Sequence, residues 1–274
     1  MLDFTGRPLV MAIVNCTEDS FYSGSHNHGV QAAVDRALWA ASDGADIIDI
    51  GGESTRPGSA YVSEDEELRR VIPVIEAFRK QSALPVSVDT RKARVAEAAL
   101  DAGADIINDI SALEDDPRMG ALCANRQAPV ILMHKKGIPQ TMQDTPYYTD
   151  VLGEVCAYLT EAADRALAAG IPREHIIIDP GIGFGKRLED NLTLITQFGK
   201  IRDLGYPVLV GLSRKTCIGE LTGREVAERL AGTTAATAFC LLEGAAIIRV
   251  HDVPEAVDFV TVIYRITQHK KKYE

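Results

Sequence analysis

Polar side chains recur in this sequence directly after short apolar runs, where several of them could act on one small molecule. The positions are Asn15, Asp89, Asn108, Asp179, Ser213, Lys215, Arg249 and His251. The carboxylates, the amide and the lysine alternate hydrogen-bond acceptors and donors, which suits a flat heterocycle with amide and amidine edges. Singly, each residue could be a helix cap or a solvated side chain, so only the joint arrangement indicates a site.

Cationic residues form a second part of the same pattern. Arg56, Arg249 and His251 also follow predicted strands. A guanidinium group binds phosphate oxygens through two parallel hydrogen bonds. The residues alone therefore predict a substrate that combines a heterocycle with an anionic group.

These residues need a scaffold that brings the ends of many strands together. Strands are predicted over residues 9–14, 46–50, 86–89, 106–109, 130–133, 176–179, 208–212 and 246–250. Amphipathic segments between them predict helices over residues 30–42, 66–80, 93–102, 119–125, 151–169, 190–204, 226–243 and 254–268. The strands are continuous apolar runs, which is typical of parallel strands buried on both faces.

Three joints between a helix and the next strand are nearly identical, which favours one repeating architecture. They read Gly44-Ala45-Asp46-Ile47-Ile48, Gly103-Ala104-Asp105-Ile106-Ile107 and Gly244-Ala245-Ala246-Ile247-Ile248. Eight such units predict an α/β fold, a single (β/α)8 TIM barrel domain over residues 1–274. A doubly wound open sheet also alternates strand and helix. It usually carries a glycine-rich turn after its first strand, where this chain has Asn15-Cys16-Thr17-Glu18-Asp19.

The predicted βα loops 1, 2 and 5 are long, over residues 15–29, 51–63 and 134–150. These loops lie on the catalytic rim of a barrel, where long loops act as lids or clamps. The glycine-rich stretch from Asp179 to Lys186 matches neither a Walker A loop nor G-x-G-x-x-G. It predicts a tight loop whose backbone approaches a ligand, with Phe184 offering an aromatic face.

Bulk composition excludes several classes of protein. The chain has 274 residues and a net charge of −10, which argues against a nucleic-acid partner. No apolar run approaches the ~20 residues of a membrane span, and no signal pattern opens the chain. Five cysteines without a C-x-x-C pair indicate scattered reduced thiols. We expect a cytoplasmic protein with no membrane partner.

Eight segments resemble the dihydropteroate synthase family, in the family's order and over nearly the whole chain. The most specific are Asp49-Ile50-Gly51-Gly52-Glu53-Ser54-Thr55-Arg56-Pro57-Gly58 and the stretch from Asp179 to Lys186. The others are residues 14–21, 87–90, 107–110, 132–134, 213–215 and 249–253. The resemblance implies a TIM barrel that condenses 6-hydroxymethyl-7,8-dihydropterin diphosphate with p-aminobenzoate, giving 7,8-dihydropteroate and diphosphate in folate biosynthesis.

The resemblance also implies a role for each matching residue. Asp89, Asn108, Asp179 and Lys215 would hold the pterin. Thr55, Arg56, Arg249, His251 and Asn15 would hold the diphosphate, with Asn15 beside Mg²⁺ as the metal cofactor. Phe21, Pro57, Phe184 and Ser213 would form the p-aminobenzoate slot, and Asp19 would join them in binding substrate. Asp89, Lys215, Arg249 and His251 would be catalytic. The family further implies a homodimer and competition by sulfonamides.

Three departures from the family pattern accompany this match. Glu18 stands where proline is usual. Lys135-Lys136 follow the histidine after the fifth strand, where the family usually has methionine or a similar residue. Thr216-Cys217 follow Ser213-Arg214-Lys215, where an aromatic residue is common at the second position. Two alternative functions stay open. One is a pterin-binding methyltransferase-like domain, which would not be expected to keep Ser213-Arg214-Lys215 together with Arg56, Arg249 and His251. The other is a catalytically silent pterin-binding paralogue.

Overall fold

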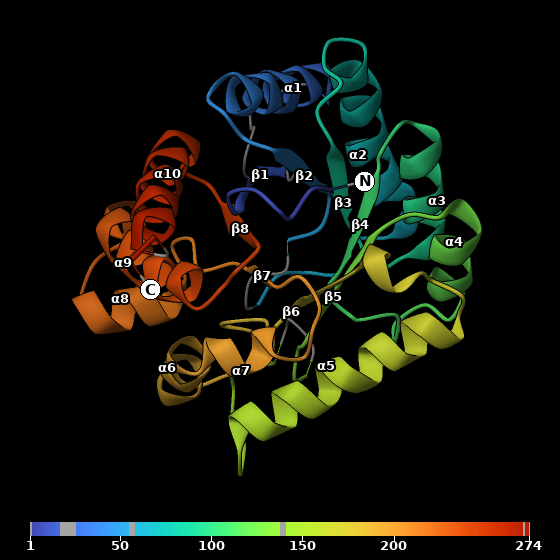
Figure 1. Cartoon of the computed structure of the whole chain (residues 1–274). Coiled ribbons are helices and arrows are strands. Elements are labelled where there is room, and N and C mark those ends of the chain that lie inside the picture. Colours follow the sequence, from blue (N-terminus) through green and yellow to red (C-terminus); the bar gives the residue numbers. More distant parts are fainter. Residues whose placement is uncertain (1, 17–25, 55–57, 138–140, 271, 274) are drawn as a thin grey trace.

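The computed structural model describes residues 2–16, 26–54, 58–137, 141–270 and 272–273, and shows eight parallel strands wound into a barrel (Figure 1). Neighbouring strands follow the order β6-β5-β4-β3-β2-β1-β8-β7, and a parallel bridge between Ile178 and Val208 joins the two ends. The strands are β1 (Leu9–Asn15), β2 (Ile47–Gly51), β3 (Val86–Asp89), β4 (Ile106–Asp109), β5 (Val130–Met133), β6 (Ile176–Asp179), β7 (Leu209–Val210) and β8 (Ile247–Val250).

The strand order decides between the two predicted architectures. Strand β1 pairs in parallel with both β2 and β8, so the first and last strands of the chain are neighbours. A doubly wound open sheet would place β1 in its interior next to a strand other than the last. The predicted (β/α)8 TIM barrel is therefore confirmed.

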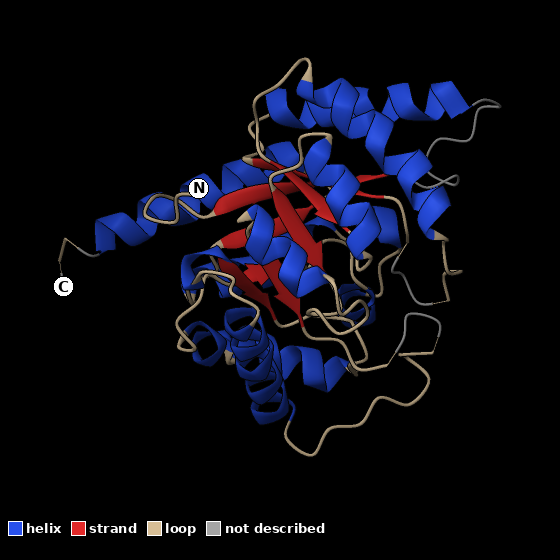
Figure 2. Ribbon diagram, turned by 90° about the vertical axis from the view of Figure 1, so that its right-hand side faces the viewer, coloured by secondary structure: helices blue, strands red, loops and turns tan. Residues whose placement is uncertain are grey.

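Helices surround the barrel (Figure 2). They are α1 (His26–Ser42), α2 (Glu64–Arg79), α3 (Ala93–Asp101), α4 (Met119–Arg126), α5 (Val151–Ala168), α6 (Leu188–Thr196), α7 (Phe198–Arg202), α8 (Thr216–Thr222), α9 (Leu230–Leu242) and α10 (Val253–Lys270). Short 3-10 turns lie at η2 (Arg173–His175) and η3 (Val226–Glu228). Over the described residues, no helix combines the length and apolar character needed to cross a membrane.

Two apolar layers follow from the alternation of side chains along each strand. Outward-facing residues such as Ile48, Val88 and Ile248 join one large core with the helices. Inward-facing residues form a separate floor inside the barrel, made of Met11, Ile47, Ile106, Ile131, Ile177, Leu209 and Ile247. Leu2 and Phe4 pack against this floor from the N-terminal side.

The three repeated joints adopt the predicted turn. Gly44, Gly103 and Gly244 have φ of +94°, +109° and +100°, in the left-handed region that glycine enters without a Cβ penalty. The following Ile47, Ile106 and Ile247 then enter the barrel floor. A short sequence phrase therefore sets both the end of a helix and the face of the next strand.

Several predicted boundaries were wrong. The helix expected over residues 190–204 is two helices, α6 and α7, separated at Gln197. Thr196, just before the break, turns its hydroxyl back to the carbonyl of Leu192, a local bond that competes with the helix. The helix expected over 226–243 begins only at Leu230, after the 3-10 turn η3.

Strand β7 and helix α8 are the other differences. The strand expected over residues 208–212 keeps only Leu209–Val210. Helix α8 (Thr216–Thr222) was not predicted, although Gly223 closes it in a left-handed conformation with φ +68°. The helix begins where Ser213-Arg214-Lys215 turns away from the strand, so the missed helix is part of the candidate site.

Candidate active site

A polar layer lies inside the barrel above the apolar floor, at the C-terminal ends of the strands. Asp49, Asp89, Asn108, Asp179 and Arg249 contribute to it from five different strands. Arg249 donates from Nε to Asp49 Oδ2 at 2.6 Å and from a terminal nitrogen to Asp89 Oδ2 at 2.7 Å. Asn108 Nδ2 donates to the same Asp49 oxygen at 3.2 Å. Four of the five residues thus form one connected network, and Asp179 lies on a separate strand of the same layer.

Burial perturbs the carboxylates of this layer. Burial, together with the neighbouring Asp49 carboxylate, raises the pKa of Asp89 to about 7 against the pull of Arg249. Burial likewise raises the pKa of Asp179 to about 6, although Gly181 N donates to its Oδ1 at 2.7 Å. Strongly perturbed groups that converge in a cleft are typical of functional sites. The two carboxylates suit a ligand that offers several N–H donors.

Lys215 lies on the rim beside this layer. Its Nζ is 4.1 Å from the ring centroid of Phe184, and burial lowers the pKa of the ammonium to about 8, with Asp179 opposing. Phe184 packs with Ile110, Met133 and Met142 in a small separate cluster. An aromatic face beneath a cation is therefore present next to the carboxylates.

Ser213 and His251 form another part of the rim. Ser213 Oγ lies 2.9 Å from His251 Nδ1, and the backbone N–H of His251 donates to the same hydroxyl at 3.2 Å. Between Ser213 and Lys215, Arg214 has φ +57° and pairs with Asp252. This ion pair holds the left-handed turn that points Ser213 and Lys215 into the site.

Asp49 belongs to the site but was not predicted from the sequence. It is fully buried, and its Oδ1 has no hydrogen-bond partner among the described residues. The signal that could have found it is a carboxylate inside the apolar strand Ile47–Gly51, because a buried charge requires a partner. The partner, Arg249, is almost at the other end of the chain.

Other polar residues predicted on the rim serve to hold loops together. Glu53 pairs with Lys92 at 2.7 Å and with Arg91 at 3.2 Å, which anchors the start of loop 2 to the loop after β3. Lys135, one of the departures from the family pattern, pairs with Asp115 at 3.0 Å. These contacts are structural and need no ligand.

Some predicted site residues lie outside the described part of the chain. They are Asp19, Phe21, Thr55, Arg56 and Pro57, together with the departure at Glu18. Asn15, the predicted metal ligand, ends β1 beside Gly51 of β2 and is partly exposed. The described residues hold no cluster of three or more His, Cys, Asp or Glu side chains that could bind a metal.

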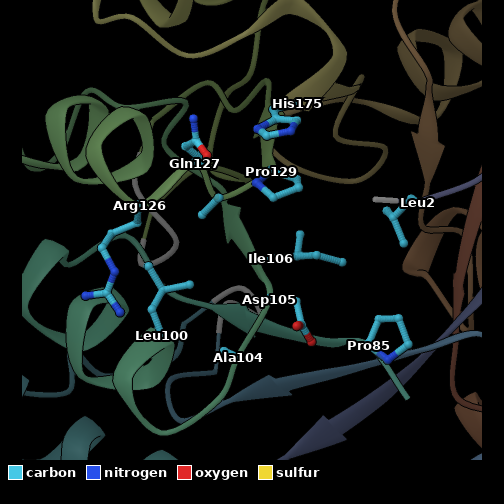
Figure 3. A pocket seen from close by; sticks show the side chains of 11 residues that line it. Leu2, Pro85, Leu100, Ala104, Asp105, Ile106, Arg126, Gln127, Pro129 and His175 are labelled. Carbon is cyan, nitrogen blue, oxygen red and sulfur yellow. The ribbon is translucent and has the colours of Figure 1, made fainter. Parts of the chain in front are cut away.

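A cavity also lies at the other end of the barrel. It measures about 510 Å³ and opens among the N-terminal ends of strands β3 to β6, as Figure 3 shows for Pro85, Asp105, Pro129 and His175. Catalytic groups of TIM barrels lie at the C-terminal ends of the strands. The polar layer, and not this cavity, therefore defines the candidate active site, a small-molecule site in the mouth of a TIM barrel.

Comparison with known proteins identifies the family of the chain. The family model described as pterin binding enzyme matches residues 11–251. The dihydropteroate synthase of Synechocystis sp. is 45% identical over 254 residues, which cover 92% of this chain and 88% of the relative. The chain belongs to the pterin-binding enzymes and, among them, to the dihydropteroate synthase family.

Solved structures of this family share the fold closely. The Xanthomonas albilineans dihydropteroate synthase with 4-aminobenzoic acid is 49% identical, with a TM-score of 0.91 over 97% of this chain and 95% of that one. The same enzyme has been solved with 7,8-dihydropteroate, at a TM-score of 0.88 and 46% identity over the same shares. The Yersinia pestis enzyme in a sulfonamide drug complex is 41% identical, with a TM-score of 0.92 over 97% and 96%.

Proposed function

We propose that this chain condenses 6-hydroxymethyl-7,8-dihydropterin diphosphate with p-aminobenzoate to give 7,8-dihydropteroate and diphosphate, a step of folate biosynthesis. The observation that carries the proposal is the hydrogen-bonded network of Asp49, Asp89, Asn108 and Arg249, beside the buried Asp179, in the mouth of the barrel. Relatives solved with 4-aminobenzoic acid and with 7,8-dihydropteroate support the same substrates.

The pterin is held by the carboxylates and the amide. Asp89 and Asp179 accept from the ring N–H and exocyclic amine, Asn108 supplies an amide, and Lys215 donates to a ring carbonyl. Because burial raises the pKa of both carboxylates, their charged forms gain from N–H donors that replace water. The network therefore favours a ring that becomes cationic as the reaction proceeds.

The reaction breaks the bond between the pterin methylene carbon and the diphosphate oxygen, which departs with the electron pair. Electron release from the dihydropterin ring stabilises the methylene cation, and Asp89 and Asp179 favour its positive charge. The aniline nitrogen of p-aminobenzoate then forms the new C–N bond with its lone pair and releases a proton. Since the anilinium formed is acidic, no strong base is needed.

The departing diphosphate is bound by Arg56, Arg249 and His251 in this proposal. Arg249 reaches from β8 into the polar layer, and His251 stands on the rim against Ser213. Asn15 fits Mg²⁺, because a partly exposed amide oxygen at a strand end is a hard ligand and this ion usually keeps waters and phosphate oxygens as its other ligands. When bound, Mg²⁺ would supply charge that stabilises the leaving diphosphate.

p-Aminobenzoate occupies a slot on the rim beside Phe184, Ser213 and Lys215, completed by Phe21 and Pro57. Phe184 presents an aromatic face, and the Lys215 ammonium above it gives a positive field for a carboxylate. Sulfonamides, which share the aniline group, compete for this slot. The Yersinia pestis relative solved in a sulfonamide drug complex supports this assignment.

The protein works in the cytoplasm as a homodimer in our proposal. Large apolar side chains are exposed on three adjoining helices, α8, α9 and α10, at Leu221, Phe239, Leu242, Val262 and Ile266. Such a surface is typical of a contact between subunits. Sedimentation of wild type against Phe239→Ser and Leu242→Ser tests it, and a monomeric wild type contradicts it.

A coupled assay of diphosphate release tests the activity. A dihydropteroate synthase releases diphosphate from the pterin substrate only when p-aminobenzoate is present and forms 7,8-dihydropteroate in equal amount. Pterin diphosphate binding without turnover would instead indicate a catalytically silent paralogue. Pterin binding with no requirement for the diphosphate would indicate a methyltransferase-like domain.

A further inference from the structure

The loop that follows β6 lies in backbone contact with the start of loop 5. Gly181 and Gly185 both have φ +64°, and a Cβ at these positions would lie 1.9 Å from His134 O and 2.1 Å from Lys136 O. No side chain can occupy such a space, so both positions require glycine. The two loops therefore form one closely packed unit beside Phe184.

Lys186 is the basic side chain at the centre of this unit, where burial lowers its pKa to about 7. Only 3% of the residue is exposed, and its Nζ donates to Gly181 O at 2.9 Å, Phe184 O at 3.1 Å and His134 Nδ1 at 2.8 Å. An ammonium group has three N–H donors, and here these contacts use all of them. Lys186 thus ties the first and last parts of its own loop to loop 5 and has no donor left for a substrate.

His134 is a suitable acceptor for this lysine. Burial and the nearby Lys186 charge lower the pKa of His134 to about 3, so the imidazole is neutral and its Nδ1 lone pair accepts. Its ring packs edge-on against Tyr158, with centroids 4.9 Å apart. The acceptor is held in place by packing, which gives Lys186 a fixed anchor outside its own loop.

Lys186 acts on the candidate site through Phe184. The Phe184 carbonyl accepts from Lys186, while the Phe184 ring lies beneath Lys215. Tyr148 adds a second tie, because its hydroxyl donates to Gly185 O at 2.8 Å. The orientation of the Phe184 ring therefore depends on a loop that Lys186 and Tyr148 help to hold, together with hydrogen bonds between its glycines and Asp179, Asn191 and Gln143.

We propose that Lys186 is a positioning residue that sets the affinity for the arylamine substrate by holding the loop of Phe184, without touching either substrate. The proposal rests on the proposed function, which assigns Phe184 to the p-aminobenzoate slot. It predicts a larger effect on p-aminobenzoate than on the pterin diphosphate. The pterin residues Asp89 and Asn108 come from other strands, whereas Asp179 and Lys215 adjoin this loop.

Steady-state kinetics of Lys186→Met test this proposal. Loss of three hydrogen bonds from the buried Lys186 amine should raise KM for p-aminobenzoate about tenfold, with a clearly smaller rise in KM for the pterin diphosphate. Lys135→Met is the matched control, because Lys135 follows His134 directly in loop 5 and has a largely covered side chain, yet it pairs with Asp115. Its KM for p-aminobenzoate should stay at the wild-type value. Equal KM values for p-aminobenzoate in both variants, or a parallel rise in both substrates' KM, would overturn the proposal.

A double-mutant cycle with Phe184→Leu tests the route through Phe184. If Lys186 acts by holding this ring, the effects of Lys186→Met and Phe184→Leu on KM for p-aminobenzoate should be strongly non-additive. Additive effects would contradict the proposal. Should Lys186→Met fail to fold, Tyr148→Phe loosens the same loop by one bond, and it should raise the same KM about threefold.

Hydrogen exchange separates this proposal from the proposed function. In the unliganded protein, Lys186→Met should speed exchange of the amides over residues 181–186, while Lys135→Met should leave them unchanged. Unchanged exchange at these amides in Lys186→Met would overturn the positioning role whatever the activity. If Lys186→Met speeds exchange at these amides but the wild-type protein has no synthase activity, the proposed function alone would be rejected.

Discussion

The two ends of the barrel bury opposite kinds of side chain on the same strands. At the N-terminal end, Met11, Ile47, Ile106 and their neighbours form an apolar floor in which no charge is buried. A few ångströms along the same strands, Asp49, Asp89 and Asp179 are buried around the partly buried Arg249. Burying ionised groups costs free energy even when they are paired. The apolar floor therefore stabilises the fold. The buried charges at the mouth lower the free energy of unfolding and form a site ready to bind a ligand.

The N-terminal end also shows that a large cavity alone does not define a site. The cavity of about 510 Å³ in Figure 3 is lined by exposed groups such as Arg126, which pairs with Asp101 at the surface, and by apolar residues. The mouth, in contrast, holds charges that come from several strands and share hydrogen bonds. Convergence of buried polar groups, more than volume, distinguishes the two ends.

Arg249→Met should produce the largest effect and should act at the mouth. It removes the cation shared by Asp49 and Asp89 and a proposed diphosphate ligand, so we expect kcat/KM to fall by about a thousandfold or more. The measurement is the coupled diphosphate-release assay, with circular dichroism to confirm folding. A folded variant that keeps a tenth or more of the wild-type kcat/KM would contradict the assignment.

Ile177→Ala should act at the floor, where it should lower stability and leave the kinetics of the folded enzyme nearly unchanged. Ile177 is 1% exposed inside the barrel, so its truncation should lower the free energy of unfolding by about 2–5 kcal/mol. Chemical denaturation measures this loss. The KM values of the folded enzyme should stay within about twofold of wild type, because the floor makes no contact with substrate in our proposal. A variant of unchanged stability with poor kinetics would remove the contrast between the two ends.

Asp89→Asn should change how stability depends on pH. Burial raises the pKa of Asp89 from 3.8 to about 7, so folding favours the protonated carboxyl. The stabilisation is complete below the unfolded pKa near 4 and is lost as the pH rises to 7, so the wild-type free energy of unfolding should fall across this window. Asparagine cannot titrate, so the variant should show a shallower fall in urea denaturation of the unliganded protein at pH 5 and 7.5. Parallel pH curves would contradict this prediction.

Arg126→Met should have the smallest effect and is the control for Arg249→Met. Arg126 forms a surface ion pair with Asp101 at 2.7 Å beside the N-terminal cavity, and such pairs contribute less than about 1 kcal/mol. Both KM values and kcat should equal those of wild type. A marked loss of activity would show that the N-terminal cavity takes part in function.

Much of the fold follows from local sequence patterns. The eight strands were predicted within a few residues because each is a short apolar run bounded by turns, and the joints at Gly44, Gly103 and Gly244 repeat one phrase. The break between α6 and α7 and the helix α8 were missed. In these places short hydrogen bonds and packing outweigh the helical pattern of the sequence.

The sequence by itself determined which residue types meet at the strand ends: acceptors at Asp89, Asn108 and Asp179, and cations at Lys215 and Arg249. A strand end is a local feature, and the barrel brings all such ends to one mouth. Only the tertiary structure decided that Arg249 lies between Asp49 and Asp89 and that Lys186 ties its loop to His134. These contacts join residues far apart in the chain, and their hydrogen bonds depend on how the closed barrel orients each side chain, which no local pattern encodes.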